Sequence, residues 1–321
     1  MYETTGIGVE AAGLGKSYDD FWALRDVDLH VPAGSVLGLL GHNGAGKTTA
    51  IKILTTLASP TTGTARVAGY DVKTQGREVR SRIGVASQAA TVDGLLTGRA
   101  NLTLVGRLYG LSKTDARTRA DELLERLDLV DAADKLVQAY SGGMRRRLDL
   151  AASIVARPAV LFLDEPTTGL DPRSRGDLWA LLRELVDGGT TIVLTTQYLE
   201  EADRLADDIV VLDHGRVVAH GTPTDLKARV GGERAEVTVS GVADLAPAAR
   251  ALDGFADAPA VTDAEALTVT VPLRGGTRLM DIVRALDAGG VDAVDVARRE
   301  ATLDDVFLSL TTTSKPEAIA A

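Results

Sequence analysis

Residues 41–48 read Gly-His-Asn-Gly-Ala-Gly-Lys-Thr and match the phosphate-binding pattern Gly-x4-Gly-Lys-Ser/Thr. The apolar run 35–40 before this loop has the length of a strand, and the segment after it favours a helix. A strand, a glycine-rich turn and a helix gather backbone N–H groups around one anion. The glycines let the backbone approach a phosphate closely, because no Cβ stands in the way. The pattern therefore predicts a nucleoside triphosphate site.

The residue types in this loop also predict individual roles. Lys47 is expected to reach the β- and γ-phosphates, and the Thr48 hydroxyl is expected to bind Mg²⁺. The residues expected to surround the nucleotide here are Gly41, His42, Asn43, Gly44, Ala45, Gly46, Lys47, Thr48 and Thr49.

Composition narrows the class of protein. The chain has 321 residues, enough for two or three domains, and its net charge of −10 argues against a general nucleic-acid binder. The sequence contains no cysteine, which removes disulfides, thiolate zinc sites and a cysteine nucleophile. It has neither an apolar run long enough to span a membrane nor an N-terminal secretory signal. We expect a cytoplasmic protein that reaches a membrane only through another polypeptide.

The first part of the chain, residues 1–228, alternates between strand-like and helix-like segments. This alternation predicts an α/β domain with a largely parallel, buried sheet. A helical insert is expected at about 90–145, where turn residues and helical periodicity replace the β-branched runs. The predicted strands are 7–13, 26–31, 35–40, 64–67, 82–86, 160–163, 191–195 and 208–212, and the predicted helices are 47–57, 114–127, 144–156, 174–187 and 199–205.

A second domain is expected at 229–311. Its segments follow the order β-α-β-β-α-β, which predicts a small α+β unit of the ferredoxin-like type. A last helix is expected from Thr302, a plausible N-cap, with Asp304 and Asp305 in its first turn. The tail 312–321 is polar and alanine-rich and is expected to be disordered.

Two carboxylates follow a buried strand later in the chain. Four apolar residues, 160–163, precede Asp164 and Glu165. In a chain with a phosphate loop, this pattern is typical of a Walker B element, in which Asp164 helps to hold Mg²⁺. Glu165 would then face the γ-phosphate and polarise the attacking water as general base.

A second anion-binding helix start is predicted at 140–144, which reads Tyr-Ser-Gly-Gly-Met. Ser141, Gly142 and Gly143 lie where a helix would begin. A simple N-cap would also explain the serine, but its position shortly before the Walker B strand favours the nucleotide-binding role. The next three residues, Arg145, Arg146 and Arg147, are expected to be a solvated face.

These motifs, in this order, resemble the ATP-binding subunit of an ABC transporter over about residues 7–225. The resemblance implies that Tyr18 stacks on adenine and that Asp171 is the D-loop residue at a subunit interface. It also implies that Gln88 contacts Mg²⁺ or the water and senses the membrane partner. One chain carries one phosphate loop and one signature. In the family that this chain resembles, the phosphate loop of one subunit faces the signature of another. The resemblance therefore implies a homodimer around two ATP molecules, with Ser141 of one chain closing on the phosphate held by Lys47 of the other.

Two departures from the family pattern narrow the resemblance. Met144 stands where the signature usually has glutamine, and Gln197 stands after the strand 191–195 where the family usually has histidine. A glutamine still forms hydrogen bonds but carries neither a proton nor a charge. Both features, together with the ending 301–308, resemble the daunorubicin-resistance group of antibiotic exporters. The resemblance implies an ATP hydrolase on the inner face of the cell membrane that powers a separate permease.

Other classes of function stay open at this point. A soluble ABC-type ATPase acting on nucleic acid or the ribosome shares the nucleotide motifs, but usually needs paired ATPase domains, a long coiled coil or zinc cysteines. A nucleotide-binding regulator with little turnover is a third reading, motivated by Gln197. An importer subunit is disfavoured by Met144 and Gln197.

Overall fold

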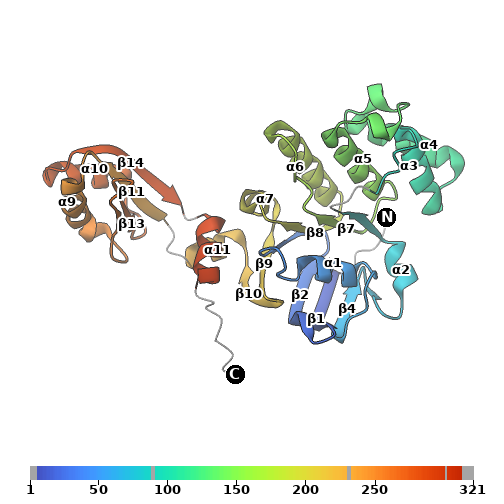
Figure 1. Ribbon diagram of the computed structural model, residues 1–321, viewed down its shortest axis with the longest axis horizontal. Coiled ribbons are helices and arrows are strands. Elements are labelled where there is room, and N and C mark those ends of the chain that lie inside the picture. The colour runs from blue at the N-terminus through green and yellow to red at the C-terminus, as the bar shows by residue number, and fades with distance from the viewer. Residues whose placement is uncertain (1–5, 88–90, 230–232, 301, 313–321) are drawn as a thin grey trace. The chain divides into compact units, whose positions relative to one another are not determined.

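The computed structural model describes residues 6–87, 91–229, 233–300 and 302–312. The chain forms two compact units, residues 1–220 and 221–321 (Figure 1). Each unit has its own sheet system and its own hydrophobic core. Gln88 and the tail 313–321 lie outside the described residues.

A six-stranded sheet forms the centre of the first unit. Strands β6, β7, β8, β3 and β9 are parallel neighbours, so their carboxyl ends meet along one edge of the sheet. Strands β3 and β8 are buried along their whole length, as expected for a parallel sheet covered on both faces. In spatial order the strands are β10 (Arg216–Gly221), β9 (Asp208–Asp213), β3 (Val36–Leu40), β8 (Thr191–Thr196), β7 (Val160–Asp164) and β6 (Ile83–Ala86).

Alternating residues of β7 show how this sheet is covered. Leu161 and Leu163 belong to one core cluster, with residues of α5 (Gly142–Ile154) and α6 (Pro172–Asp187). Phe162 belongs to the other, with residues of α1 (Lys47–Leu54) and of the N-terminal strands. Because successive side chains of a strand point to opposite faces, the parallel sheet is the middle layer of three.

The N-terminal strands form a second, antiparallel sheet beside the expected parallel one, and this second sheet was not predicted. Strands β1 and β2 are joined by the two-residue turn Asp19–Asp20, and so short a connection allows only antiparallel pairing. Both strands are longer than predicted, because they continue through register shifts that the sequence signals as breaks. The order is β2 (Phe21–Pro32), β1 (Ile7–Tyr18), β4 (Thr62–Val67) and β5 (Tyr70–Asp71).

Three helices of the first unit that follow β6 begin at a capping hydroxyl. Thr97, Ser112 and Ser141 each accept a hydrogen bond from the backbone N–H three residues later, at 3.1, 3.1 and 3.2 Å. The first two helices are α3 (Gly98–Leu108) and α4 (Lys113–Arg126), and the third is α5. Short helices α2 (Gly76–Arg80) and α7 (Leu199–Leu205) complete the unit.

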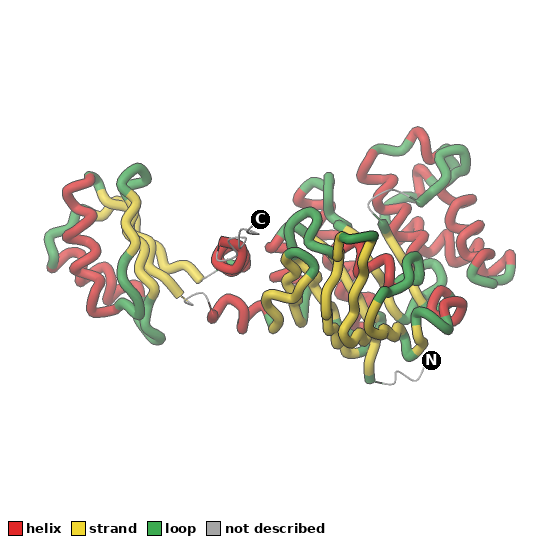
Figure 2. The backbone as a smooth tube through the Cα atoms, turned by 60° about the horizontal axis from the view of Figure 1, so that its bottom comes forward, coloured by secondary structure: helices red, strands yellow, loops and turns green. Residues whose placement is uncertain are grey.

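The second unit contains a four-stranded antiparallel sheet with helices α9 and α10 on one face (Figure 2). Its elements are β11 (Glu233–Val239), α9 (Val242–Leu252), β12 (Val261–Asp263), β13 (Thr268–Pro272), α10 (Leu279–Ala288) and β14 (Ala293–Glu300). The spatial order is β12-β13-β11-β14, which is a split β-α-β arrangement. Helix α11 (Leu303–Thr312) packs against α8 (Pro223–Arg229), and Thr302 caps α11 by accepting from the Asp305 N–H at 3.3 Å.

No helix among the described residues is long and apolar enough to cross a membrane.

Candidate functional site

The predicted phosphate loop leaves the carboxyl end of β3 and enters α1, as its sequence requires. Gly44 and Gly46 have φ of 87° and 111°, in the left-handed region that favours glycine. A Cβ on Gly46 would lie 2.6 Å from the backbone oxygen of Ala23, so no larger residue fits there without movement. Gly46 is also the N-cap of α1, so the first N–H groups of the helix face the loop.

The Lys47 side chain turns back into this loop. Its Nζ donates to the backbone oxygens of Gly41 and His42, at 2.6 and 3.1 Å. Only 6% of the residue is exposed. Burial lowers the pKa of Lys47, and the negative charges of Glu165 and Asp164 oppose that shift. A buried ammonium therefore lies between the loop and the two carboxylates, where it favours a bound polyphosphate.

The two carboxylates stand at the end of β7, and Thr195 of the neighbouring strand β8 contacts both residues. Its hydroxyl donates to the Asp164 carboxylate, and its backbone oxygen accepts from the Glu165 N–H at 3.0 Å. Glu165 has φ of 51°, which is uncommon for a residue with a Cβ. The Thr168 hydroxyl donates to Glu165 Oε2 at 3.3 Å. Glu165 is thus held in a turn that a free chain rarely adopts.

The phosphate loop and the two carboxylates border one cavity of about 410 Å³. The predicted site residues that line it are Tyr18, His42, Asn43, Gly44, Gly46, Lys47, Thr48, Thr49, Asp164 and Glu165. The structure thus brings together the loop, the carboxylate pair and the N-terminal aromatic residue. Tyr18 and Asp164 are more than 140 positions apart in the sequence.

Two aromatic side chains stand at this cavity, and the sequence predicted only one of them. Tyr18 and Phe21 are directly paired across the β1–β2 turn, and they are 45% and 65% exposed. Exposed aromatic rings beside a phosphate loop offer a stacking surface for a base. Phe21 and Ala23, both on β2, line the cavity but were missed. The two-residue spacing of the hairpin was the signal that could have linked Phe21 to Tyr18.

The remaining predicted residues lie away from the cavity lining. Ser141, Gly142 and Gly143 form the start of α5, and a Cβ on Gly142 would meet open space. Asp171 is the N-cap of α6, and hydrogen bonds from the backbone and hydroxyl of Ser174 lower its pKa. Both helix starts are exposed at the surface. They are accessible to a second molecule.

Gln197 follows β8 at the same sheet edge as the carboxylates. Its side chain is exposed, and it is not among the residues that line the cavity. Gly41 and Ala45 are buried within the phosphate loop and support it from behind. Gln88 lies outside the described residues.

One arginine of the signature helix does not belong to a solvated face, which corrects the expectation for 145–147. Arg146 is half-buried and donates to the backbone oxygens of Asp164, Glu165 and Pro166, at 3.0, 2.6 and 3.0 Å. The Arg146 guanidinium lies against these carbonyl groups because buried carbonyl oxygens need hydrogen-bond donors. Burial lowers the pKa of Arg146, against the opposing charges of nearby carboxylates.

The donor set of the cavity fits Mg²⁺. The Thr48 hydroxyl and the Asp164 carboxylate both line it, and oxygen atoms are the ligands that Mg²⁺ prefers. Thr195 orients the carboxylate from behind, as a supporting residue does at a metal site.

A family model described as ABC transporter matches residues 24–168. The chain is 53% identical to the daunorubicin resistance ATP-binding protein DrrA2 of Streptomyces coeruleorubidus over 95% of both chains. It is 39% identical to the Nod factor export ATP-binding protein I of Burkholderia thailandensis, over 92% of this chain and 94% of that protein. A dimeric ATP-binding cassette solved in a post-hydrolysis state with ADP and Pi superposes with a TM-score of 0.63 and 26% identity, over 67% of this chain and 98% of that one.

Proposed function

The chain belongs to the ATP-binding subunits of ABC transporters, and from this premise we propose that it hydrolyses ATP to power efflux of a drug or antibiotic-like compound. The observation that carries the proposal is the cavity in which the phosphate loop, Asp164, Glu165 and Tyr18 meet. Relatives named for daunorubicin resistance and for export support the direction of transport.

ATP is proposed to lie with its base on the aromatic pair Tyr18 and Phe21 and its phosphates in the loop. The N–H groups at the start of α1 and the Lys47 ammonium then surround the β- and γ-phosphates. Mg²⁺, held by Thr48 and Asp164, would neutralise part of the negative charge on the transferred phosphoryl group.

Glu165 is proposed as the general base. Its backbone leaves the end of β7 in the left-handed region, and the Thr195 and Thr168 contacts hold it there. A carboxylate in this position can accept a proton from the water that attacks the γ-phosphate. Gln197 follows the neighbouring strand and is proposed to orient the same water or the γ-phosphate once the site closes. Gln88 is proposed to contact Mg²⁺ or this water. A Gln197→Ala variant with unchanged turnover would remove Gln197 from this role.

Closure is proposed to require a second copy of the chain. The starts of α5 and α6 carry Ser141 and Asp171, are exposed, and lie apart from the cavity of their own chain. Each would complete the site of a partner chain in an ATP-bound homodimer, so that binding and hydrolysis shift the population between closed and open dimers. The solved dimeric cassette supports this arrangement.

The helical insert around α3 to α5 is the proposed contact with a separate membrane permease, which would place the protein on the inner face of the cell membrane. The second domain, proposed at 229–311, is assigned to dimer stabilisation or permease contact. Removing residues 230–321 without effect on assembly and transport would contradict that assignment.

Phosphate release in the presence of Mg-ATP, measured at several protein concentrations, tests the proposal. Hydrolysis should rise faster than linearly with protein concentration, because two chains form each site. A protein that binds ATP but releases no phosphate at any concentration would instead be a nucleotide-binding regulator.

A further inference from the structure

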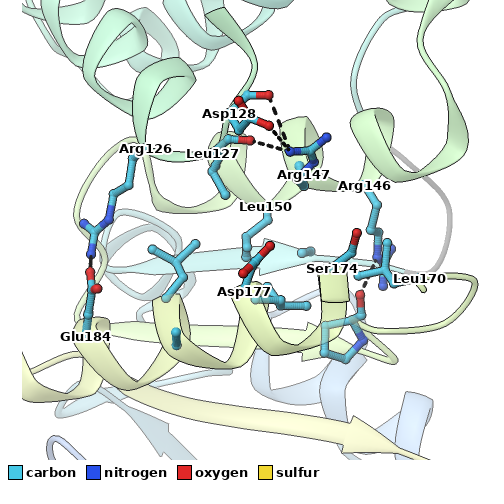
Figure 3. A pocket seen from close by; sticks show the side chains of 15 residues that line it. Arg126, Leu127, Asp128, Arg146, Arg147, Leu150, Leu170, Ser174, Asp177 and Glu184 are labelled. Carbon is cyan, nitrogen blue, oxygen red and sulfur yellow. Dashed lines mark hydrogen bonds and ion pairs between the residues drawn. The ribbon is translucent and has the colours of Figure 1, made fainter. Parts of the chain in front are cut away.

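The side chain of Arg146, on the signature helix α5, donates hydrogen bonds to four backbone oxygens, and no sequence motif predicts these contacts. Besides the oxygens of Asp164, Glu165 and Pro166, it donates from Nη1 to the backbone oxygen of Ser87 at 2.6 Å. Ser87 directly precedes Gln88 in the chain. One side chain thus donates to backbone oxygens at the carboxyl ends of two neighbouring parallel strands, β6 and β7. Figure 3 shows the Arg146 side chain leaving α5, with a dashed line at its guanidinium.

The chemistry of this contact needs an arginine. A guanidinium holds five N–H donors in one rigid plane, and Arg146 uses Nε, Nη1 and Nη2 on four acceptors. A lysine has three donors on one nitrogen and cannot reach acceptors spread along a guanidinium. Carbonyl groups bonded by a charged donor are held more firmly than those bonded by a neutral one.

The peptide groups of Glu165 are held from both sides. Its N–H donates to the Thr195 oxygen at 3.0 Å, and its carbonyl accepts from Arg146 at 2.6 Å. Because Glu165 has φ of 51°, its backbone depends on such contacts to keep this turn. The direction of the Glu165 side chain is therefore set partly by α5.

The same helix also holds the chain on the other side of residues 88–90. Asp149, one turn after Arg146, accepts from the Thr91 N–H at 2.7 Å and from the Thr91 hydroxyl at 2.5 Å. Arg146 bonds Ser87 before this segment, and Asp149 bonds Thr91 after it. Both flanks of the segment that contains Gln88 are thus attached to α5.

The neighbouring residue Arg147 provides a contrast. It donates to the Leu127 oxygen at 3.0 Å and pairs with Asp128, so it joins α5 only to the end of α4 (Figure 3). A cavity of about 320 Å³ lies beside both arginines, between α4 and α6. The Arg147 contacts thus end at α4, whereas the Arg146 contacts reach the ends of β6 and β7.

We propose that Arg146 is a positioning residue that transmits movement of the signature helix α5 to Glu165 and to Ser87. The inference rests on the proposed function, because it concerns the same hydrolysis. When a second chain or the permease displaces the start of α5, Arg146 moves the carbonyl groups of Asp164, Glu165 and Pro166 with it. ATP binding, which depends on the phosphate loop, is left largely unaffected.

Arg146→Gln and Arg146→Lys test this role, with Arg147→Gln as the matched control. We expect Arg146→Gln to lower kcat at least tenfold while KM for ATP stays within twofold of the wild-type value. Arg146→Lys should not restore kcat, and Arg147→Gln should leave both constants within twofold. Amide hydrogen exchange should become faster at residues 84–87 and 164–168 in Arg146→Gln only. Rates are compared per nucleotide-binding site titrated, which removes the effect of unfolded protein.

Three outcomes separate the inference from its premise. Hydrolysis by the wild type with unchanged kcat in Arg146→Gln would overturn the role of Arg146 alone. Equal losses in Arg146→Gln and Arg147→Gln would also overturn it, because both arginines would then merely support α5. No hydrolysis by the wild-type dimer would instead contradict the proposed function.

Discussion

The Thr195 hydroxyl donates its hydrogen to the carboxylate of Asp164 across the β7–β8 pair. Thr195 is fully buried, so this contact is shielded from water. It fixes the orientation of the carboxylate that is proposed to bind Mg²⁺.

Thr195→Val keeps the shape of the side chain and removes the donor. We expect the Mg²⁺ concentration for half-maximal hydrolysis to rise roughly tenfold, as is typical when a supporting partner of a metal ligand is lost. Titration of hydrolysis with Mg²⁺ measures this shift. The matched control is Thr191→Val in the same strand, where the lost hydroxyl accepts from the Gly34 N–H at 3.0 Å, away from the cavity. An equal shift in both variants would contradict the assignment.

Glu165→Gln should abolish turnover without abolishing ATP binding. The amide keeps the size of the side chain but cannot accept the proton of the attacking water, so hydrolysis should fall by roughly 10²-fold or more. Phosphate release and ATP binding are measured on the same preparation. Glu184→Gln, which removes an exposed carboxylate paired with Arg126, should hydrolyse ATP at the wild-type rate. Near-normal turnover by Glu165→Gln would eliminate Glu165 as the base.

The aromatic pair should contribute to affinity rather than to the chemical step. Tyr18→Ala or Phe21→Ala should weaken ATP binding, with the larger loss of about 1–3 kcal/mol from the ring that stacks on the base. Direct binding measurements with ATP are compared with kcat, which should change little. Leu108→Ala removes another exposed apolar side chain, 77% exposed, from the helical insert and serves as control. Wild-type affinity in both aromatic variants would place the base elsewhere.

Glu201 makes stability depend on pH. Burial raises the pKa of its carboxyl above the ordinary value of 4.5, against hydrogen bonds that include one from Trp179 Nε1 at 3.3 Å. The folded state therefore holds this proton more tightly than the unfolded state, and stability is lost as pH rises from about 4.5 through the raised pKa.

Glu201→Gln should remove this loss, because the amide does not ionise and its oxygen still accepts from Trp179. Above the raised pKa the variant should gain roughly 1.4 kcal/mol over the wild type for each unit of the shift. Urea unfolding at a series of pH values measures the difference. A stability difference between the two proteins that does not vary with pH would contradict the assignment.

Local patterns in the sequence were sufficient to single out the residues that are proposed to bind phosphate. The loop 41–48, the pair Asp164–Glu165 and the cap at Ser141 each form within a few residues of the chain, so spacing alone identified them. Most strands and helices of the first unit were predicted for the same reason, but α2, α3 and β10 were not. Tyr18, implied by family resemblance, does line the cavity.

Features that depend on distant partners were not predicted. Nothing near Arg146 in the sequence distinguishes it from Arg147, and only the fold brings Ser87, 59 positions away, within reach of its guanidinium. The antiparallel sheet was missed because its strands continue through register shifts that locally resemble strand ends. Thr195 reads as one more β-branched residue of a buried strand, and its contact with Asp164 exists only once β7 and β8 pair.

Completion of the nucleotide site by a second chain is the central proposal. Its direct test is light scattering, which measures the molar mass of Glu165→Gln in solution with Mg-ATP. The same measurement is made on Glu165→Gln proteins that carry a second substitution. Ser141→Ala and Ser112→Ala each remove the N-cap of an insert helix, so both should cost about 1 kcal/mol of stability.

Glu165→Gln alone, and with Ser112→Ala, should shift from 33.6 kDa to twice that mass when Mg-ATP is added. With Ser141→Ala the shift should need at least tenfold more ATP, because the partner's phosphate loses its contact. If the mass doubled at the same ATP concentration with Ser141→Ala as with Ser112→Ala, a site shared between two chains would be contradicted. A mass that doubled in none of the three proteins would contradict it as well.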